Sequence, residues 1–325
     1  MGKEVDIAAL GELLIDFTEA GYSKDGMKLF EQNPGGAPAN LLTVASHMGY
    51  KTAFIGKVGN DMHGDFLKKT LQKEGIDTSA LIEDESCFTT LAFVEIDEKG
   101  ERKFSFARKP GADTQLKKED LDRSVLENCK IFHFGSLSLT DEPARGAALE
   151  AIRIAKEAGA VISYDPNYRS SLWKDEQTAV NAMKSVISLA DVMKVSDEES
   201  LLLTGAKSYE EAADSLLAIG LKLVAVTLGK DGVLVATKNG KNHIAGFQTN
   251  AVDTTGAGDS FWGGFLSNYL SLDKNVENLT EEEIKACAVQ GNAVASLCVQ
   301  KRGGIPAIPD GEEVRRFLAD VKKED

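Results

Sequence analysis

The most informative segment of this sequence is Asp253-Thr254-Thr255-Gly256-Ala257-Gly258-Asp259-Ser260-Phe261. Beyond it, Phe261, Phe265 and Tyr269 recur every four residues, which predicts a helix that begins at the Gly-Ala-Gly turn. Backbone N–H groups at a helix N-terminus have no intrahelical partner, and glycines let an anion approach them closely. The turn therefore predicts a phosphate-binding site.

Asp259 falls in the first turn of this predicted helix, beside the anion site. A carboxylate there can accept the proton of an attacking hydroxyl while the N–H groups stabilise charge on a transferred phosphoryl group. The alternative is that Asp259 only complements the helix dipole. The chain contains neither the G-x-x-x-x-G-K-[ST] phosphate loop nor a G-x-G-x-x-G dinucleotide fingerprint, which argues against a P-loop ATPase and an NAD-dependent enzyme.

Two N-terminal segments carry further candidate ligand contacts. Asn33-Pro34-Gly35-Gly36-Ala37-Pro38-Ala39-Asn40 leads into helical spacing up to position 48. Asn40 can both donate and accept hydrogen bonds, as recognition of a sugar hydroxyl requires. Asp16 follows the first predicted strand, at the sheet edge where open α/β sheets bind ligands. A tight turn and a capping aspartate are the alternatives.

Outward from these segments, short apolar runs alternate with amphipathic helical patterns. This alternation predicts an α/β protein with a mostly parallel sheet covered on both faces, in one domain over residues 1–325. The predicted strands are 7–10, 52–55, 131–134, 161–164, 192–195, 223–227 and 232–236, with helices at 147–158 and 210–219.

Two segments, about 17–33 and 87–113, interrupt the alternation. The second contains apolar runs at 91–96 and 102–106 around a polar turn at 97–100, which predicts paired strands. A strand pair inserted into an α/β domain forms a lid, an oligomer contact or a hairpin without function.

Composition restricts the class of partner. The 325 residues carry a formal net charge of −14, which argues against nucleic acid and an anionic membrane surface as partners. The four cysteines are scattered, no zinc-ligand cluster is apparent, and no apolar leader is seen. These features predict a cytoplasmic protein with reduced thiols. His133 lies in an apolar run and is predicted to be a core residue.

The segment 253–261 resembles the C-terminal signature of the ribokinase-like (PfkB) sugar kinases, and 35–40 resembles their N-terminal signature. Similar segments extend over nearly the whole chain. The resemblance implies a three-layer αβα fold with a small β-strand lid, use of ATP and Mg²⁺, and phosphorylation of a sugar hydroxyl. It also implies a homodimer formed through the lid strands.

The same resemblance implies a role for each matching residue. Asp259 would be the catalytic base, assisted by Arg169 and by an anion hole of Gly256, Ala257 and Gly258. The implied sugar contacts are Asp16, Gly35, Gly36, Asn40 and Arg108. The implied nucleotide contacts are Asn167, Lys194, Ser196, Glu199, Thr227, Gly229, Gly232 and Asn292. Glu199 would also act indirectly on Mg²⁺, and Asp253, Thr255 and Gly303 resemble the monovalent-cation site of some members, with K⁺ as the candidate ion.

One motif departs from the family pattern, because the usual N-x-x-E reads Ser196-Asp197-Glu198-Glu199 here. The strings at 132–139, 108–113 and 164–169 resemble those of fructokinases, and the last is shared with 2-keto-3-deoxygluconate kinases. The expected activity is therefore phosphorylation of the 6-hydroxyl of D-fructose. The alternatives are a 2-keto-3-deoxygluconate kinase, with Arg108 and Arg169 facing the substrate carboxylate, and a non-catalytic sugar- or nucleotide-binding protein. Surface ion pairing is the alternative for both arginines.

Overall fold

The computed structural model describes residues 3–96 and 102–324. Within them, one large sheet has the strand order β13-β12-β11-β10-β9-β8-β1-β4-β5. All pairings are parallel except those of β12 and β13 at one edge. The strands are β1 (Val5–Leu10), β4 (Thr52–Gly59), β5 (Leu81–Asp84), β8 (Cys129–Gly135), β9 (Val161–Asp165), β10 (Val192–Ser196), β11 (Leu223–Thr227), β12 (Val233–Thr237) and β13 (Gly240–Ile244).

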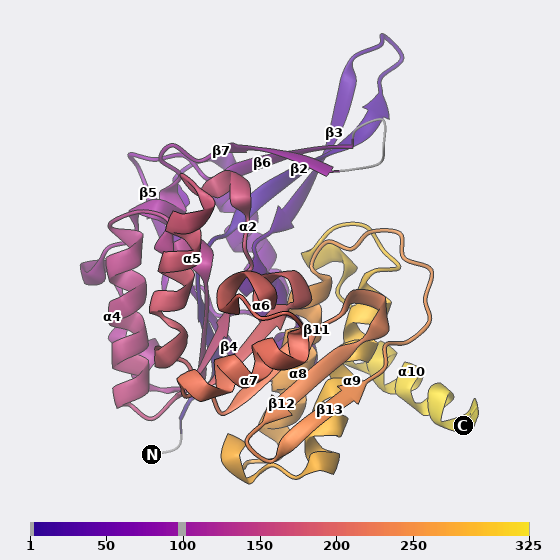
Figure 1. Cartoon of the computed structure of the whole chain (residues 1–325). Helices are drawn as coiled ribbons and strands as arrows, with labels where there is room; N and C mark the ends of the chain where they lie inside the picture. The colour runs from indigo at the N-terminus through magenta and orange to yellow at the C-terminus, as the bar shows by residue number, and fades with distance from the viewer. Residues whose placement is uncertain (1–2, 97–101, 325) are drawn as a thin grey trace.

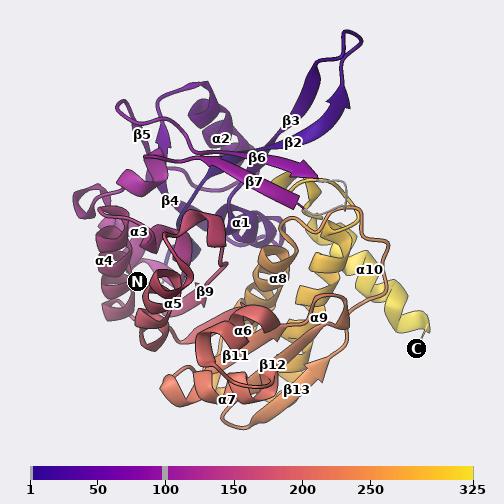
Figure 2. The same ribbon diagram turned by 45° about the horizontal axis from the view of Figure 1, so that its top comes forward.

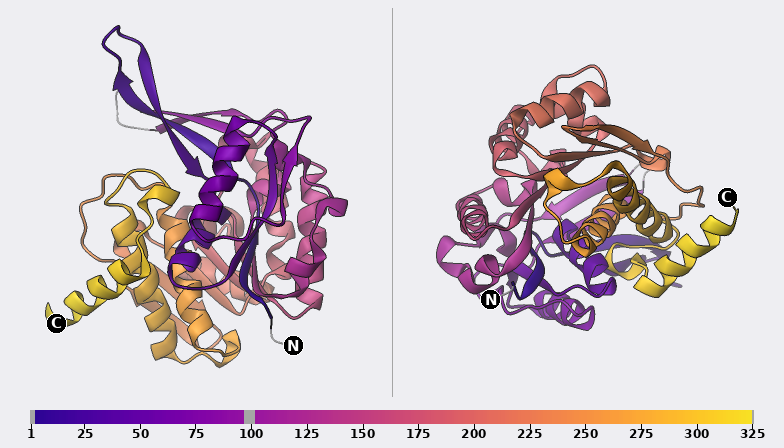
Figure 3. Two further views of the ribbon diagram at one scale, coloured as in Figure 1. Left: turned by 180° about the vertical axis from the view of Figure 1, so that it is seen from behind. Right: turned by 90° about the horizontal axis from the view of Figure 1, so that it is seen from below.

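Helices cover both faces of this sheet (Figures 1 and 3). Strand β1 shows why, because Ala8 and Leu10 join one buried cluster while Ile7 and Ala9 join another on the opposite face. The first face is covered by α3 (Arg123–Glu127), α4 (Ala144–Glu157), α5 (Glu176–Ser185), α6 (Asp197–Thr204) and α7 (Tyr209–Ile219). The second is covered by α1 (Ala37–His47), α2 (Met62–Lys73), α8 (Ala257–Ser271) and α9 (Glu281–Cys298), with α10 (Gly311–Glu324) packed outside α1 and α9.

This arrangement confirms the predicted three-layer α/β fold. All seven predicted strands overlap observed ones. The helices predicted at 147–158 and 210–219 overlap α4 and α7, and those predicted after the two glycine turns overlap α1 and α8. The antiparallel edge strand β13 was not predicted, because its sequence is mostly polar and exposed. No helix among the described residues is long and apolar enough to cross a lipid bilayer.

A second, four-stranded sheet stands over one end of the large sheet, in the order β3-β2-β6-β7 (Figure 2). Its strands are β2 (Leu14–Tyr22), β3 (Lys28–Gly35), β6 (Leu91–Ile96) and β7 (Arg102–Ala107). The two predicted lid segments supply these strands, and the predicted turn at 97–100 lies outside the described residues. Because β2 follows β1 after three residues, the lid sheet begins directly at the carboxyl edge of the large sheet.

Candidate active site

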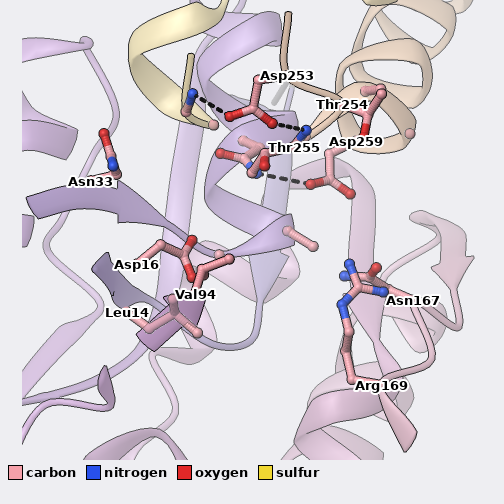
Figure 4. A pocket seen from close by; sticks show the side chains of 18 of the residues that line it. Leu14, Asp16, Asn33, Val94, Asn167, Arg169, Asp253, Thr254, Thr255 and Asp259 are labelled. Carbon is pink, nitrogen blue, oxygen red and sulfur yellow. Dashed lines mark hydrogen bonds between the residues drawn. The ribbon is translucent and has the colours of Figure 1, made fainter. Parts of the chain in front are cut away.

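A cavity of about 740 Å³ lies between the lid sheet and the carboxyl ends of the parallel strands. Its volume is typical of small-molecule sites, and its position is the one where open α/β sheets bind ligands. Figure 4 places Asp259 between the lid residues Asp16 and Asn33 on one side and Asn167 and Arg169 on the other. The predicted sugar and nucleotide segments therefore meet at one cavity.

Helix α8 begins in the wall of this cavity. Its N-cap, Gly256, has a φ of 74°, a left-handed conformation that glycine adopts without strain. The N–H group of Ala257 donates to the carbonyl of Thr254 at 3.2 Å, so this member of the predicted anion hole is already engaged. Helix geometry leaves the N–H groups of Gly258 and Asp259 for a ligand. Of the three residues predicted to form the anion hole, Gly258 therefore has its N–H group directed out of the helix N-terminus, together with that of Asp259.

The Asp259 carboxyl is buried in the first turn of α8, and its Oδ2 accepts a hydrogen bond from Nδ2 of Asn40 at 2.8 Å. Burial raises the pKa of Asp259 to about 6, assisted by Asp165 and opposed by Lys194, Asn40 and Arg169. The group is therefore ionised at neutral pH yet basic enough to take a proton, the combination that a general base requires.

Lys194, a predicted nucleotide contact, is buried in the middle of β10, with Nζ 2.8 Å from Oδ2 of Asp165. A Cβ on Gly258 would lie 2.8 Å from the same Nζ, so the ammonium lies directly beside the start of α8. Burial alone would lower the pKa of Lys194, but the carboxylates of Asp165, Glu199 and Asp259 outweigh it and raise the pKa. A fixed positive charge is thus held next to the anion site.

The loop after β9 carries two further predicted residues. Asn167 has a φ of 44°, an uncommon conformation that asparagine tolerates better than most residues. Its backbone N–H donates to Asp165 at 3.1 Å. The Arg169 side chain is exposed and faces the cavity near Asp259 (Figure 4). Its Nη1 donates to the carbonyl of Tyr168 at 3.0 Å, which leaves the other N–H groups of the exposed guanidinium available to a ligand.

The departure at Ser196 has a structural explanation. Ser196 is the N-cap of α6, where its hydroxyl accepts from the N–H of Glu199 at 3.1 Å, and Glu199 accepts from the N–H of Ser196 at 2.9 Å. This reciprocal pair is a capping box, in which serine and asparagine are equally good N-caps. The second Glu199 oxygen accepts from the N–H of Tyr168 at 2.6 Å, so Glu199 also fixes the loop that carries Asn167 and Arg169.

On the sugar side, Asp16 on β2 pairs with Asn33 on β3, and both line the cavity. A Cβ at Gly35 would contact the Asp16 carboxylate, and a Cβ at Gly36 would contact the carbonyl oxygen of Glu12. Gly36 also has a φ of 127°, which confines this position to glycine. Gly35 therefore makes room for Asp16, whereas Gly36 and Asn40 line the cavity themselves.

Arg108, an implied sugar contact, lies outside the lining of the cavity. Its guanidinium is buried and engaged by Asp113, with Nε 2.8 Å and Nη2 2.7 Å from Oδ2, and it also donates to the hydroxyl of Thr140 and the carbonyl of Leu137 at 3.0 Å each. A buried guanidinium loses its hydration, and these hydrogen bonds and the ion pair compensate for that loss. Arg108 thus fastens the end of β7 to the main domain.

Three predicted nucleotide contacts also lie outside the cavity wall. Asn292, on α9, donates to the carbonyl of Ala245 at 2.9 Å and so anchors the segment after β13. Gly229 and Gly232 have φ values of 58° and 97° and shape the turn after β11. Thr227, at the end of β11, does line the cavity.

The predicted cation-site residues are brought together by one carboxylate. Asp253 accepts hydrogen bonds from the N–H groups of Thr255 at 2.8 Å and Gly303 at 3.1 Å, as the dashed lines of Figure 4 mark. All three line the cavity beside α8. Among residues 3–96 and 102–324, no cluster of three or more acidic, histidine or cysteine side chains is placed to hold a metal ion.

Among the wall residues that sequence reasoning did not assign are two polar ones at the centre of the sugar side, Glu12 and Asn33. Asn33 begins the quoted segment 33–40, and Glu12 lies four residues before Asp16, but each was passed over for a neighbour. Glu12 lies in the loop after the first predicted strand, where an acidic residue is usually solvated, yet here it is 3% exposed. His133 is a core residue as predicted, with Nδ1 2.9 Å from the Ser163 hydroxyl and a pKa lowered by burial to about 3.

The cavity combines a helix N-terminus and an adjacent cation, which suit a phosphate group, with a buried basic carboxylate, which suits a hydroxyl. Under a lid on a mostly parallel α/β sheet, this combination is typical of a small-molecule kinase. Comparison with known proteins specifies the family. Residues 5–311 match the model of the pfkB family carbohydrate kinases. The chain is 42% identical to fructokinase-2 of Oryza sativa subsp. japonica over 306 residues, 93% of this chain and 90% of that protein.

Solved structures agree. The fructokinase of Xylella fastidiosa with bound ATP superposes with a TM-score of 0.91 at 31% identity, covering 98% of this chain and 99% of that one. A double mutant of the Vibrio cholerae O395 fructokinase with fructose, ADP and potassium ion gives 0.87 at 32% identity, with the same coverage. The chain belongs to the pfkB family of carbohydrate kinases.

Proposed function

We propose that this chain is a fructokinase that transfers the γ-phosphate of Mg·ATP to the 6-hydroxyl of D-fructose. The observation that carries the proposal is the buried Asp259 carboxylate, held by Asn40 at the N-terminus of α8 inside the cavity. The similarity to fructokinases over nearly the full chain supports fructose as the sugar.

Asp259 takes the proton of the sugar hydroxyl, and the hydroxyl oxygen forms a bond to the γ-phosphorus as the bond to the ADP oxygen breaks. The N–H groups of Gly258 and Asp259, with Lys194 beneath them and Arg169 opposite, stabilise the charge on the transferred group. Asp16, Gly36 and Asn40 hold the sugar with its hydroxyl towards Asp259. The lid excludes water, which limits ATP hydrolysis.

The nucleotide would lie along Thr227, Ser196 and Asn167, on the cavity side away from the lid strands. Mg²⁺ supplies positive charge between the phosphates. Glu199 fits an indirect role in holding it, because both its oxygens already fix backbone N–H groups. The carboxylate of Asp253 and the hydroxyl of Thr255 are hard oxygen donors of the kind that K⁺ would take.

The cavity favours a neutral sugar over 2-keto-3-deoxygluconate. Its sugar side is lined by the acidic residues Asp16 and Glu19, which would repel a substrate carboxylate. Arg108, one of the two cations considered for that carboxylate, is engaged by Asp113. Arg169 remains, and it is needed near the transferred phosphate.

The test is ADP release with Mg·ATP against fructose, 2-keto-3-deoxygluconate, ribose, glucose and mannose. The proposal predicts that kcat/KM for fructose exceeds that for every other sugar at least tenfold, and that ATP hydrolysis without sugar is slow. A preference for the keto acid would contradict the substrate assignment, and no phosphorylation of any sugar would favour a binding protein.

We further propose one kinase domain over residues 1–325, a homodimer formed through the lid, and a cytoplasmic location. The lid segments rejoin the large sheet on both sides, which supports a single domain. Exposed aromatic side chains on the lid support the dimer. The use of ATP and four unpaired cysteines support the location.

A further inference from the structure

Glu12 is a buried acidic residue of the cavity wall to which the proposed chemistry gives no role. It lies in the loop between β1 and β2 and is 3% exposed. Burial raises the pKa of Glu12 to about 7, with its own N–H and that of Ala37 lowering it, Asp113 raising it and Arg108 lowering it. An acidic side chain in such surroundings is costly to bury, which marks it as a candidate functional residue.

Both the side chain and the backbone of Glu12 contact the start of α1. Oε1 accepts a hydrogen bond from the N–H of Ala37, the first residue of the helix, at 3.0 Å. The N-cap, Gly36, has no side chain to do this, and its Cα packs so closely on the Glu12 carbonyl that a Cβ would contact it. Glu12 therefore supplies, from 25 residues away, the cap that α1 lacks locally.

The first turn of α1 carries the contact to the proposed base. The N–H of Asn40 bonds to the Gly36 carbonyl at 2.9 Å, and its side chain donates to Asp259 at 2.8 Å. That hydrogen bond lowers the pKa of Asp259. Besides Asn40, the charged and titratable groups that act on Asp259 are Lys194 of β10, Asp165 of β9 and Arg169 of the following loop, with Cys298 of α9 nearby.

We propose that Glu12 is a positioning residue, which caps α1 from the β1–β2 loop and so fixes Asn40 against the Asp259 carboxylate. The proposal rests on the proposed kinase chemistry for its kinetic consequence, whereas the geometric link from Glu12 to Asp259 does not depend on which sugar is phosphorylated.

The test compares Glu12→Met, which has a similar size and no acceptor, with Glu12→Gln, whose amide oxygen can still accept from Ala37. For Glu12→Met, kcat/KM should fall about ten- to a hundredfold, because small misplacements of reacting groups are costly. The acid limb of its pH profile should move up by about half a unit to one unit, because a weaker Asn40 bond raises the pKa of Asp259. Glu12→Gln should restore most of the rate and the position of the limb.

A double-mutant cycle with Asn40→Ala isolates the pathway. If Glu12 acts through Asn40, Glu12→Met should add little to the limb shift of Asn40→Ala. Ser208→Ala is the matched control, because Ser208 caps α7 through the N–H of Glu211, away from the cavity. It should lower the melting temperature without moving the acid limb.

An activity-independent readout separates this proposal from the proposed function. The pH dependence of the melting-temperature difference between the protein and Asp259→Asn reports the pKa of Asp259 without substrate. Glu12→Met should shift it upwards even if no sugar is phosphorylated. An unshifted pKa of Asp259 in Glu12→Met would overturn the positioning role. A rise in the sugar KM alone, with the acid limb of the pH profile unchanged, would also overturn it and would indicate that Glu12 contacts the sugar directly.

Discussion

At the scale of single residues, the proposed base is a source of instability. Its pKa is about 6 in the folded chain against an ordinary value of 3.8, so the native state binds this proton more tightly than the unfolded state does. Stability is therefore lost as pH rises from about 4 to 6, and the loss persists at pH 7 at roughly 3 kcal/mol. Such trade-offs between stability and activity are common at active sites.

The first prediction concerns Asp259→Asn. Removing the base should lower kcat about 10²- to 10⁴-fold. Because the variant carries no buried charge and its amide oxygen can still accept from Asn40, its melting temperature at pH 7 should rise, and the gain should vanish near pH 4. Steady-state kinetics and thermal melts from pH 4 to 8 measure both effects. Near-normal turnover would remove Asp259 from the proposed chemistry.

At the scale of elements, one carboxylate holds both legs of the β6–β7 hairpin. Asp113 accepts from the hydroxyl of Thr90, which precedes β6, and pairs with Arg108, which follows β7. Arg108 in turn bonds to Leu137 and Thr140 beside the cavity. The lid is thus tied to the main domain at its base, although its strands form a separate sheet.

The second prediction follows for Thr90→Val, which preserves shape but removes the hydroxyl from one leg. The unsatisfied Asp113 oxygen should lower stability by about 1–3 kcal/mol, and looser lid closure should raise the sugar KM several-fold and increase ATP hydrolysis without sugar. Thr52→Val is the control, because the buried Thr52 hydroxyl has no hydrogen-bond partner among the described residues. Equal effects of the two substitutions would show that Thr90 does not control the lid.

At the scale of the whole molecule, several large apolar side chains of the lid are exposed. Phe93 is 38% exposed and packs against Phe17 and Phe30, and Met27 and Leu29 lie exposed on the projecting β2–β3 hairpin. Figure 2 shows this hairpin extending beyond the body of the molecule. An exposed apolar sheet of this kind is a typical protein–protein interface.

The third prediction is that light scattering will give about twice the 34.9 kDa chain mass at micromolar concentration. Phe30→Glu should shift the mass towards the single chain, because it places a charge in the interface. Leu149→Glu is the matched control, since Leu149 is similarly exposed but lies on α4, away from the lid. A single-chain mass at all concentrations, or equal masses for the two variants, would contradict a lid-mediated dimer.

The sequence by itself determined the fold and the centre of the site, because the signals involved are local. Short continuous apolar runs specify buried strands such as β1, and a Gly-Ala-Gly turn before a helical repeat specifies the helix N-terminus that carries Asp259. Ser196 could also have been understood locally, since S-x-x-E before a helix is a capping box.

Only the tertiary structure decided what Arg108, Asn292 and Glu12 contact. Leu137 lies 29 residues from Arg108, Ala245 lies 47 from Asn292, and Ala37 lies 25 from Glu12. The sequence identifies a charged or amide side chain, but it does not identify the hydrogen-bond partner that the side chain needs once it is buried. That partner depends on which loops the packed sheet and helices bring together. In this fold Arg108 and Asn292 bond to distant backbone carbonyls, and Glu12 becomes part of the cavity wall.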